Sequence, residues 1–117
     1  LIFIQSTPSK RDRRDVIRKT WANPENSQSI KKNLTRVFFM IGNGESITED
    51  LFREISTHDD LIVIDVEDTY KNLVYKTDVT LHTTSNLCSS AFAMKVDEDV
   101  VFHIDRMYER VSNIFIR

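Results

Sequence analysis

Three consecutive acidic residues, Asp97, Glu98 and Asp99, have the types and spacing best suited to chemistry in this sequence. They directly follow an apolar run, residues 91–96, that is typical of a buried strand. Because residues two apart in an extended chain point the same way, we expect Asp97 and Asp99 to face one divalent cation. Carboxylate oxygens suit Mg²⁺ or Mn²⁺, which keep open positions for water and substrate phosphates. The alternative is an acidic stretch on a solvated loop.

Motifs of several other kinds of active site are absent from the sequence. The chain contains no glycine-rich phosphate-binding motif (GxGxxG or GxxxxGKS/T), no HExxH zinc motif and no GxSxG nucleophile turn. The three histidines, His58, His82 and His103, lack the spacing of metal ligands and indicate surface or packing residues. Cys88 is the only cysteine, so the chain can form neither an internal disulfide nor a cysteine-based zinc site.

The elements that must position the acidic residues follow from hydrophobic patterning. Four apolar runs predict buried strands, at residues 1–5, 36–41, 61–66 and 91–96. Four segments predict helices, at residues 11–21, 46–58, 69–86 and 104–116. Strands that alternate with amphipathic helices indicate parallel β-α-β units with helices on both faces of the sheet, so we expect a Rossmann-like α/β fold.

Some details of the helices can also be predicted. Val16 and Trp21 are among the apolar positions of the first helix, and residues 25–33 are polar enough to form a loop. Ser46 is a candidate cap for the second helix, whose apolar positions include Phe52. The last helix has an apolar face that needs a partner to cover it.

Composition and charge narrow the function classes. The chain has 117 residues, of which 40% are hydrophobic and 29% charged, so it is one ordinary globular domain or part of one. Its net charge of −2 argues against a general nucleic-acid binder. Residues 1–36 carry 9 Lys and Arg against 3 acids, and residues 37–117 carry 7 against 15. The two parts could bind an anion and a cation respectively, or could be two solvated surfaces.

The sheet rule selects the loops in which a ligand would bind. In open α/β sheets the ligand lies beyond the carboxyl ends of the strands, near the point where the strand order reverses. Those loops are residues 6–14, 42–46, 65–69 and 97–99. A receiver-like or phosphohydrolase domain would need an aspartate at the end of the first strand, where this chain has Gln5, Ser6 and Thr7, so that alternative is disfavoured.

Four sequence blocks together carry a family resemblance. They are RRDVIRKTW at 13–21, RVFFMIG at 36–42, DVEDTYKNLVYKT at 65–77 and MKVDEDV at 94–100. In this order they resemble the beta-1,3-galactosyltransferase-like glycosyltransferases, which include N-acetylglucosaminyl and Fringe-type transferases. The chain departs from the family pattern at Glu98, where Asp is usual, at Val74 and Tyr75, and in lacking a Trp before Cys88.

The resemblance implies a GT-A type fold and a metal-dependent inverting transfer of a hexose from a UDP-sugar to a glycan hydroxyl on protein or lipid. It implies Mn²⁺ or Mg²⁺ as the cofactor, with Asp99 as a direct ligand and Asp97 bound through water or to the ribose. Glu98 would orient the donor. The family's catalytic domains continue beyond the acidic motif, so residues 1–117 would be the nucleotide-sugar half, with the catalytic base and a membrane anchor outside it. The setting implied is the Golgi lumen.

Three arginines begin the first predicted helix, whose N-terminal amides attract an anion. Some of Arg13, Arg14 and Arg18 are expected to face the nucleotide or to support its loop, with Arg14 the candidate for donor binding. The alternative is that they pair with acidic helices across the surface.

Several further residues have two readings. Asp68 and Lys76, in the third block, are candidates for donor binding, although Asp68 would equally serve as a helix cap. Lys95 would contact the donor or pair with an acid. Trp21 and Tyr70 would stack on a base or sugar, or belong to the core.

Two broader expectations remain open. A truncated or degenerate transferase acting only as a nucleotide- or protein-binding module is the alternative function. The triplet Asn33-Leu34-Thr35 is a glycosylation acceptor in a polar loop and agrees with a lumenal setting.

Overall fold

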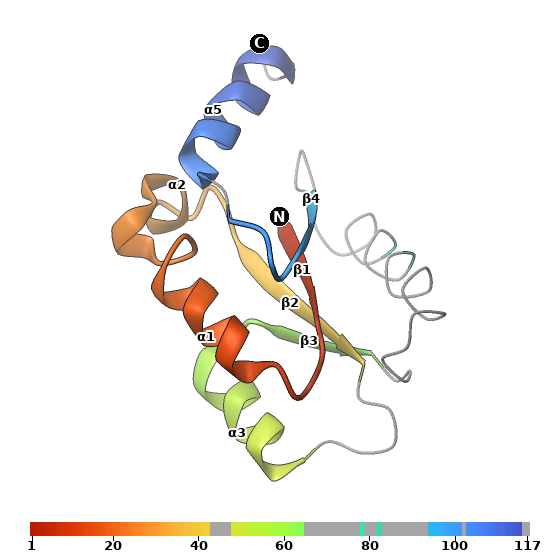
Figure 1. Cartoon of the computed structure of the whole chain (residues 1–117). Helices are drawn as coiled ribbons and strands as arrows, with labels where there is room; N and C mark the ends of the chain where they lie inside the picture. The colour runs from red at the N-terminus through yellow and green to blue at the C-terminus, as the bar shows by residue number, and fades with distance from the viewer. Residues whose placement is uncertain (43–47, 65–77, 79–81, 83–93, 102, 116–117) are drawn as a thin grey trace.

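In the described part of the chain, four parallel strands form a sheet at the centre of the molecule (Figure 1). The computed structural model describes residues 1–42, 48–64, 78, 82, 94–101 and 103–115. The strands are β1 (Ile2–Ser6), β2 (Val37–Gly42), β3 (Leu61–Ile64) and β4 (Met94–Asp97). Their order across the sheet is β3-β2-β1-β4, and all three pairings are parallel. The predicted α/β class with a parallel sheet is therefore confirmed.

Each strand contributes side chains to two apolar layers because neighbouring residues point to opposite faces. On one face, Ile2 and Ile4 of β1 pack with Phe39 of β2. On the other, Phe3 packs with Met40. β1 is buried along its whole length, which explains why its first three residues are all apolar and do not alternate with polar ones.

Five helices are described. They are α1 (Arg11–Lys19), the 3₁₀ helix η1 (Pro24–Asn26), α2 (Gln28–Lys31), α3 (Glu49–His58) and α5 (Ile104–Phe115). Helices α1, α2 and α3 lie on the same side of the sheet in Figure 1. Ile17, Trp21 and Ile104 pack against the layer formed by Ile2 and Ile4. The helix predicted at residues 69–86 falls outside the described residues, apart from two isolated positions.

The predicted boundaries of the first helices need correction. Helix α1 ends at Lys19, and Val16 is 59% exposed, because its buried positions are Arg14 and Ile17. Residues 25–33 are not a simple loop but contain η1 and α2, whose first residues are capped by the side chains of Asn23 and Ser27.

Helix α3 also differs from its prediction. It begins after Thr48, whose Oγ1 accepts a hydrogen bond from the Leu51 amide at 3.2 Å, and Ser46 lies outside the described residues. Phe52 is 63% exposed, because the buried positions of this helix are Leu51 and Glu54. In both α1 and α3 a charged residue therefore occupies a position that the apolar pattern would not assign to the interior.

Helix α5 is tied to α2 by a single carboxylate. Asp105 accepts hydrogen bonds from the amides of Ser29 (3.0 Å) and Gln28 (2.9 Å), and from the hydroxyls of Ser27 and Ser29 (2.8 Å each). The backbone amides of Ser29 and Gln28 are the main reason that the pKa of Asp105 lies well below its usual range. At the start of α5, Ile104 is buried in the core and Met107 is partly buried against it, so the sheet layer covers this end of its apolar face. Within the described part of the chain, none of the helices has the length and apolar character needed to cross a bilayer.

Candidate functional site

The acidic residues lie on a turn at the end of β4. We use the name acidic turn for residues 97–100, which are closed by a hydrogen bond from the Val100 amide to the Asp97 carbonyl oxygen at 3.2 Å. We expected the side chains of Asp97 and Asp99 to point the same way because the chain would be extended there. That premise is wrong, because the strand ends at Asp97 and the chain then turns. Both carboxylates are nevertheless exposed at the same edge of the sheet.

The topology of the sheet places this turn where a ligand is expected. β4 pairs with β1 so that Asp97 lies beside Gln5, while β2 and β3 lie on the other side of β1. The boundary between β1 and β4 is therefore the point at which the strand order reverses. Of the loops selected from the sequence, residues 6–14 and 97–99 are brought together, and residues 65–69 lie outside the described part of the chain.

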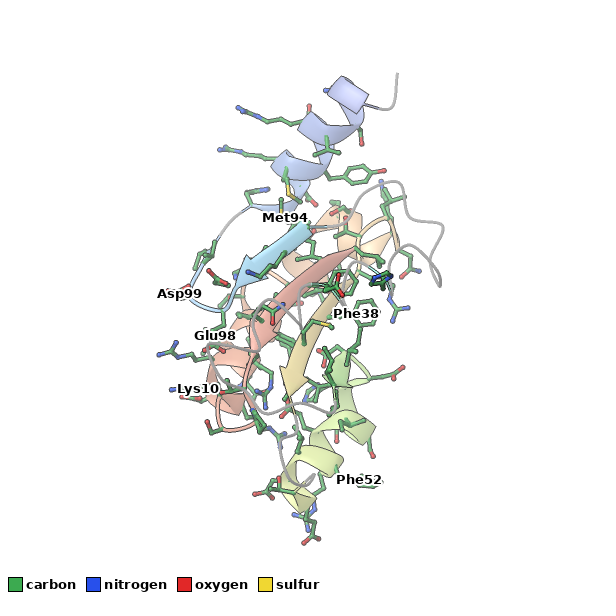
Figure 2. All side chains as sticks on the ribbon, turned by 90° about the vertical axis from the view of Figure 1, so that its right-hand side faces the viewer. Lys10, Phe38, Phe52, Met94, Glu98 and Asp99 are labelled. Carbon is green, nitrogen blue, oxygen red and sulfur yellow. The ribbon has the colours of Figure 1, made fainter. Side chains whose placement is uncertain are left out.

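Glu98 behaves differently from its two neighbours. Its Oε2 accepts a hydrogen bond from Ser6 Oγ at 3.0 Å, and its Oε1 lies 3.4 Å from Arg13 Nη1. The Glu98 side chain is 16% exposed, against 68% for Asp97. In Figure 2, Asp99 lies at the outer edge of the turn and Glu98 lies nearer to α1. Glu98 therefore points back onto the protein, and Asp97 and Asp99 remain open to solvent.

Arg14 supports the loop that follows β1. Its Nε and Nη2 donate to the two carboxylate oxygens of Glu54, at 2.7 and 2.6 Å. Its Nη1 donates to Ser6 Oγ at 3.0 Å and to the Thr7 carbonyl oxygen, and Nη2 also donates to the Pro8 carbonyl oxygen at 3.2 Å. Arg14 is 0% exposed, so it has no surface open to a ligand. Arg14 therefore supports the loop and pairs with an acid, which were two of its predicted roles.

Arg18 extends the same ion-pair network. It donates to Glu54 at 2.8 Å, to Asp60 at 2.7 and 2.8 Å and to Asp15 at 2.8 Å. Burial opposes the charge on Arg18, but the hydrogen bonds to Asp60 and Glu54 outweigh it and raise its pKa above its usual range. Burial likewise opposes the charge on Glu54, and the bonds from Arg14 and Arg18 reverse that effect and lower its pKa. The alternative in which Arg18 pairs with acidic residues is therefore the observed one.

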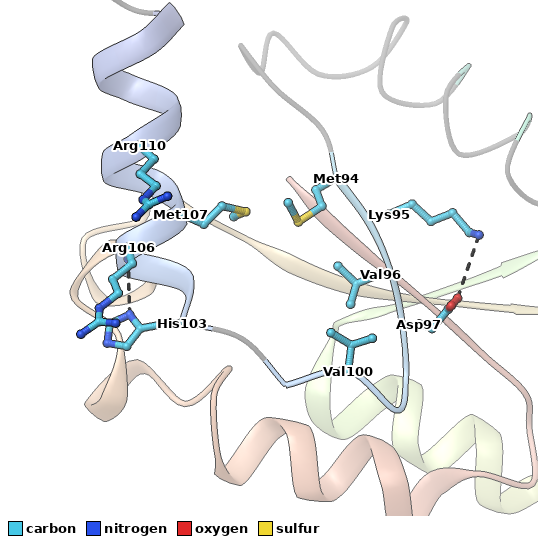
Figure 3. A pocket seen from close by; sticks show the side chains of 9 residues that line it. All are labelled: Met94, Lys95, Val96, Asp97, Val100, His103, Arg106, Met107 and Arg110. Carbon is cyan, nitrogen blue, oxygen red and sulfur yellow. Dashed lines mark hydrogen bonds and ion pairs between the residues drawn. The ribbon is translucent and has the colours of Figure 1, made fainter.

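The remaining predicted residues have varied outcomes. Lys95 Nζ lies 4.0 Å from Asp97 Oδ1, so it pairs with an acid, as one of its two readings predicted (Figure 3). Trp21 is buried in the core, which was the second of its two predicted roles. Asp68, Lys76 and Tyr70, like Cys88, lie outside the described residues.

Two hollows adjoin the acidic turn. The larger, about 550 Å³, lies between β4 and α5, with Met94, Val96 and Met107 on its apolar side and Arg106 and Arg110 on its basic side (Figure 3). The smaller, about 220 Å³, lies between α1 and the turn. Its lining includes Arg13, Val16, Trp21, Glu98, Asp99 and Val101.

The donor set fits a cation that shares its coordination with a substrate. Among the described residues no group of three or more His, Cys, Asp or Glu side chains is placed to hold a metal ion. The two open carboxylates of the acidic turn thus do not form a closed protein cage. Mg²⁺ and similar hard cations are commonly bound by one or two carboxylates together with water and substrate phosphates, and Asp97 and Asp99 suit that arrangement.

Sequence reasoning missed Glu54 and Ser6. Glu54 lies three residues after Leu51, on the face that α3 buries. This helical spacing was the one feature of the sequence that could have indicated that Glu54 is buried. Ser6 is the last residue of β1, and its hydroxyl contacts both Arg14 and Glu98. No spacing rule links residues so far apart in the chain.

A parallel sheet flanked by helices, with open carboxylates beyond the point where its strand order reverses, defines an α/β domain of the Rossmann-like class. The model of the Galactosyltransferase family matches residues 12–117, and the chain belongs to this family.

Similar proteins agree with the family assignment. The chain is 40% identical to beta-1,3-galactosyltransferase bre-2 of Caenorhabditis elegans in an alignment that covers 97% of this chain and 33% of that protein. It is 31% identical to lactosylceramide 1,3-N-acetyl-beta-D-glucosaminyltransferase A of Xenopus laevis, over 97% of this chain and 32% of that protein. It is 30% identical to beta-1,3-galactosyltransferase 1 of Mus musculus, over 92% of this chain and 33% of that protein. The chain thus spans about a third of the length of these relatives.

Proposed function

We propose that this chain is the nucleotide-sugar-binding part of a glycosyltransferase that moves galactose, N-acetylglucosamine or N-acetylgalactosamine from a UDP donor to an acceptor glycan hydroxyl. The product would be a beta-1,3 linkage formed with inversion. The observation that supports this most is the pair of open carboxylates, Asp97 and Asp99, at the reversal point of the sheet in a member of the Galactosyltransferase family. The relatives' names supply the class of reaction.

The chain's own residues have distinct roles in this proposal. Asp99 would bind a Mn²⁺ or Mg²⁺ ion directly, and Asp97 would bind it through water or hold the ribose. When bound, such a cation stabilises the negative charge that the departing UDP acquires. Asp68 and Lys76 are proposed to contact the donor. Acceptor binding and deprotonation of its hydroxyl belong to parts of the whole protein that match the remainder of its relatives.

Calorimetric titration of the protein with UDP tests this function. We expect UDP to bind in the presence of Mn²⁺ and to lose most of its affinity when the metal is chelated, because neither two carboxylates nor a diphosphate alone completes a six-oxygen shell. Asp99→Ala should have the same effect as chelation. Glu49→Ala is a matched control, because Glu49 is an exposed acid on α3 that pairs with Arg53 within the described part of the chain. UDP affinity that is unchanged by the chelator or by Asp99→Ala would refute the metal-bridged donor site.

We also propose a lumenal setting in the secretory pathway, with the whole protein anchored in the Golgi membrane. Asn33 is exposed just after α2, with φ of 59°, so the acceptor side chain of the triplet Asn33-Leu34-Thr35 is accessible. Protein expressed in secretory cells should move faster in gel electrophoresis after glycosidase digestion, and Asn33→Gln should abolish the shift. A wild-type protein with no shift would remove this support without affecting the proposed reaction.

A further inference from the structure

A continuous series of polar contacts connects α3 to the acidic turn. Glu54 accepts from Arg14 Nε at 2.7 Å, Arg14 Nη1 donates to Ser6 Oγ at 3.0 Å, and Ser6 Oγ donates to Glu98 Oε2 at 3.0 Å. These four residues come from α3, α1, β1 and the acidic turn, and they span 92 positions of the chain between Ser6 and Glu98. They are close together only in the folded protein.

The first three members of this series are fixed by burial. Arg14, Glu54 and Ser6 are 0%, 1% and 3% exposed. Buried polar groups in a complete network have little freedom to rearrange, because each broken bond leaves an unsatisfied group away from water. The Ser6 hydroxyl accepts from Arg14, and this directs its own hydrogen toward Glu98.

Within the described part of the chain, Glu98 is the one acid of the turn whose carboxylate is held on both oxygens. Ser6 contacts Oε2, and Arg13 contacts Oε1 at 3.4 Å. The turn is otherwise closed by the bond between the Val100 amide and the Asp97 carbonyl oxygen. The anchored residue sits between Asp97 and Asp99, so fixing it restricts where both open carboxylates can lie.

We propose that Glu98 is a positioning residue, and that Ser6, oriented by the buried Arg14–Glu54 pair, anchors it so that the acidic turn is preorganised for a divalent cation carrying a nucleoside diphosphate. This inference rests on the proposed function. It assigns Glu98 to the protein side of the site and leaves the cation to Asp97 and Asp99. The second methylene of Glu98, which an aspartate lacks, is what extends its carboxylate toward β1.

The test combines three variants of the full-length protein with two measurements. The variants are Ser6→Ala, Glu98→Ala and the double substitution. Ser56→Ala and Glu49→Ala are matched controls, because Ser56 donates to the Phe52 carbonyl oxygen on the exposed side of α3 and Glu49 is exposed. Calorimetry gives the Mn²⁺ concentration for half-saturation with UDP present, and hydrogen exchange gives the protection of peptides that contain the Val100 amide.

Each single variant is expected to raise the half-saturating Mn²⁺ concentration about tenfold, the usual effect of removing a partner that orients a metal ligand. The double variant should need no more Mn²⁺ for half-saturation than the more strongly affected single variant, because both substitutions break the same contact. Exchange at the Val100 amide should accelerate in all three variants and in neither control. A merely structural role for Ser6 would lower the unfolding temperature and leave the Mn²⁺ dependence of the folded protein unchanged.

Failure of the inference and failure of the proposed function give different results. Wild-type protein that binds Mn²⁺ and UDP together, with single variants that bind equally well or with effects that add in the double variant, would overturn the positioning role alone. Wild-type protein that does not bind them together would overturn the proposed function. In that case faster exchange at Val100 in Ser6→Ala would still support the anchor, and unchanged exchange would refute it as well.

Discussion

The carboxylates of this protein fall into two regions with opposite surroundings. In the interface between α1 and α3, Glu54 is 1% exposed and both of its oxygens accept from arginines, namely Arg14 and Arg18. In the acidic turn, Asp97 and Asp99 are exposed. Among the described residues, the one side chain that pairs with either of them is that of Lys95, at 4.0 Å from Asp97. A carboxylate with all its acceptor positions filled stabilises the fold, and one with free positions is available to a ligand.

Glu98 shows that the two types can be neighbours. It lies within the acidic turn but has partners like those of Glu54. The comparison therefore predicts that substitutions will separate into two groups, one that lowers stability and one that lowers ligand affinity. The variants below test that separation, beginning with the largest expected loss of stability.

Removing the most enclosed carboxylate should have the largest effect. Glu54→Ala leaves the buried guanidinium of Arg14 without its main partner, and breaking a buried ion pair lowers the free energy of unfolding by about 3–5 kcal/mol. Urea denaturation followed by circular dichroism measures this loss. A loss of less than about 1 kcal/mol would mean that the network between α1 and α3 does not stabilise the fold.

Substitution of Asp105 should have an intermediate effect on the free energy of unfolding, and this effect should depend on pH. Asp105→Asn weakens four hydrogen bonds to a charged carboxylate and should lower the free energy of unfolding by about 1.5–3 kcal/mol at pH 7. The pKa of Asp105 is lowered in the folded protein, so its stabilisation is complete above the unfolded-state value of about 4 and decreases as the pH falls below it.

The pH dependence is the sharper part of this prediction. The difference in stability between wild type and Asp105→Asn should be constant from pH 7 to about pH 5 and then shrink toward pH 3. Denaturation curves at a series of pH values measure it. A difference that grows as the pH falls would contradict the assigned contacts.

Breaking the exposed ion pair on α3 should have the smallest effect on the free energy of unfolding. Glu49 and Arg53 are 2.8 Å apart, but their side chains are 80% and 66% exposed. Glu49→Gln should therefore change the free energy of unfolding by less than about 1 kcal/mol, including the loss of a favourable charge near the start of the helix. A loss as large as that of Glu54→Ala would show that burial is not what distinguishes these carboxylates.

The sheet could be predicted from the sequence because its strands are short apolar runs separated by polar segments. β1 and β2 were found within one residue of their ends, and the parallel arrangement followed from the alternation of strands and helices. The acidic turn could be placed at the carboxyl edge for the same reason. Its local shape could not, because residues 97–100 contain neither glycine nor proline to mark a turn.

The buried charges could not be predicted. An apolar pattern assigns the interior of α1 to Val16 before Arg14, and the structure reverses this because Arg14 meets Glu54, which lies 40 residues away. Periodicity reports which face of a helix is apolar but carries no information on a distant partner that neutralises a charge. The same limit hid Ser6, whose importance depends on residues from three other elements.

Thermal unfolding with and without ligand tests the central claim most directly, because one experiment reads both stability and binding. With Mn²⁺ and UDP about 100-fold above their dissociation constant, wild-type protein should gain about 2.7 kcal/mol and unfold several degrees higher. Asp99→Asn should unfold at the wild-type temperature without ligand and show no increase with it. An Asp99→Asn protein that gains as much as wild type would contradict the assignment of the acidic turn as the donor and metal site.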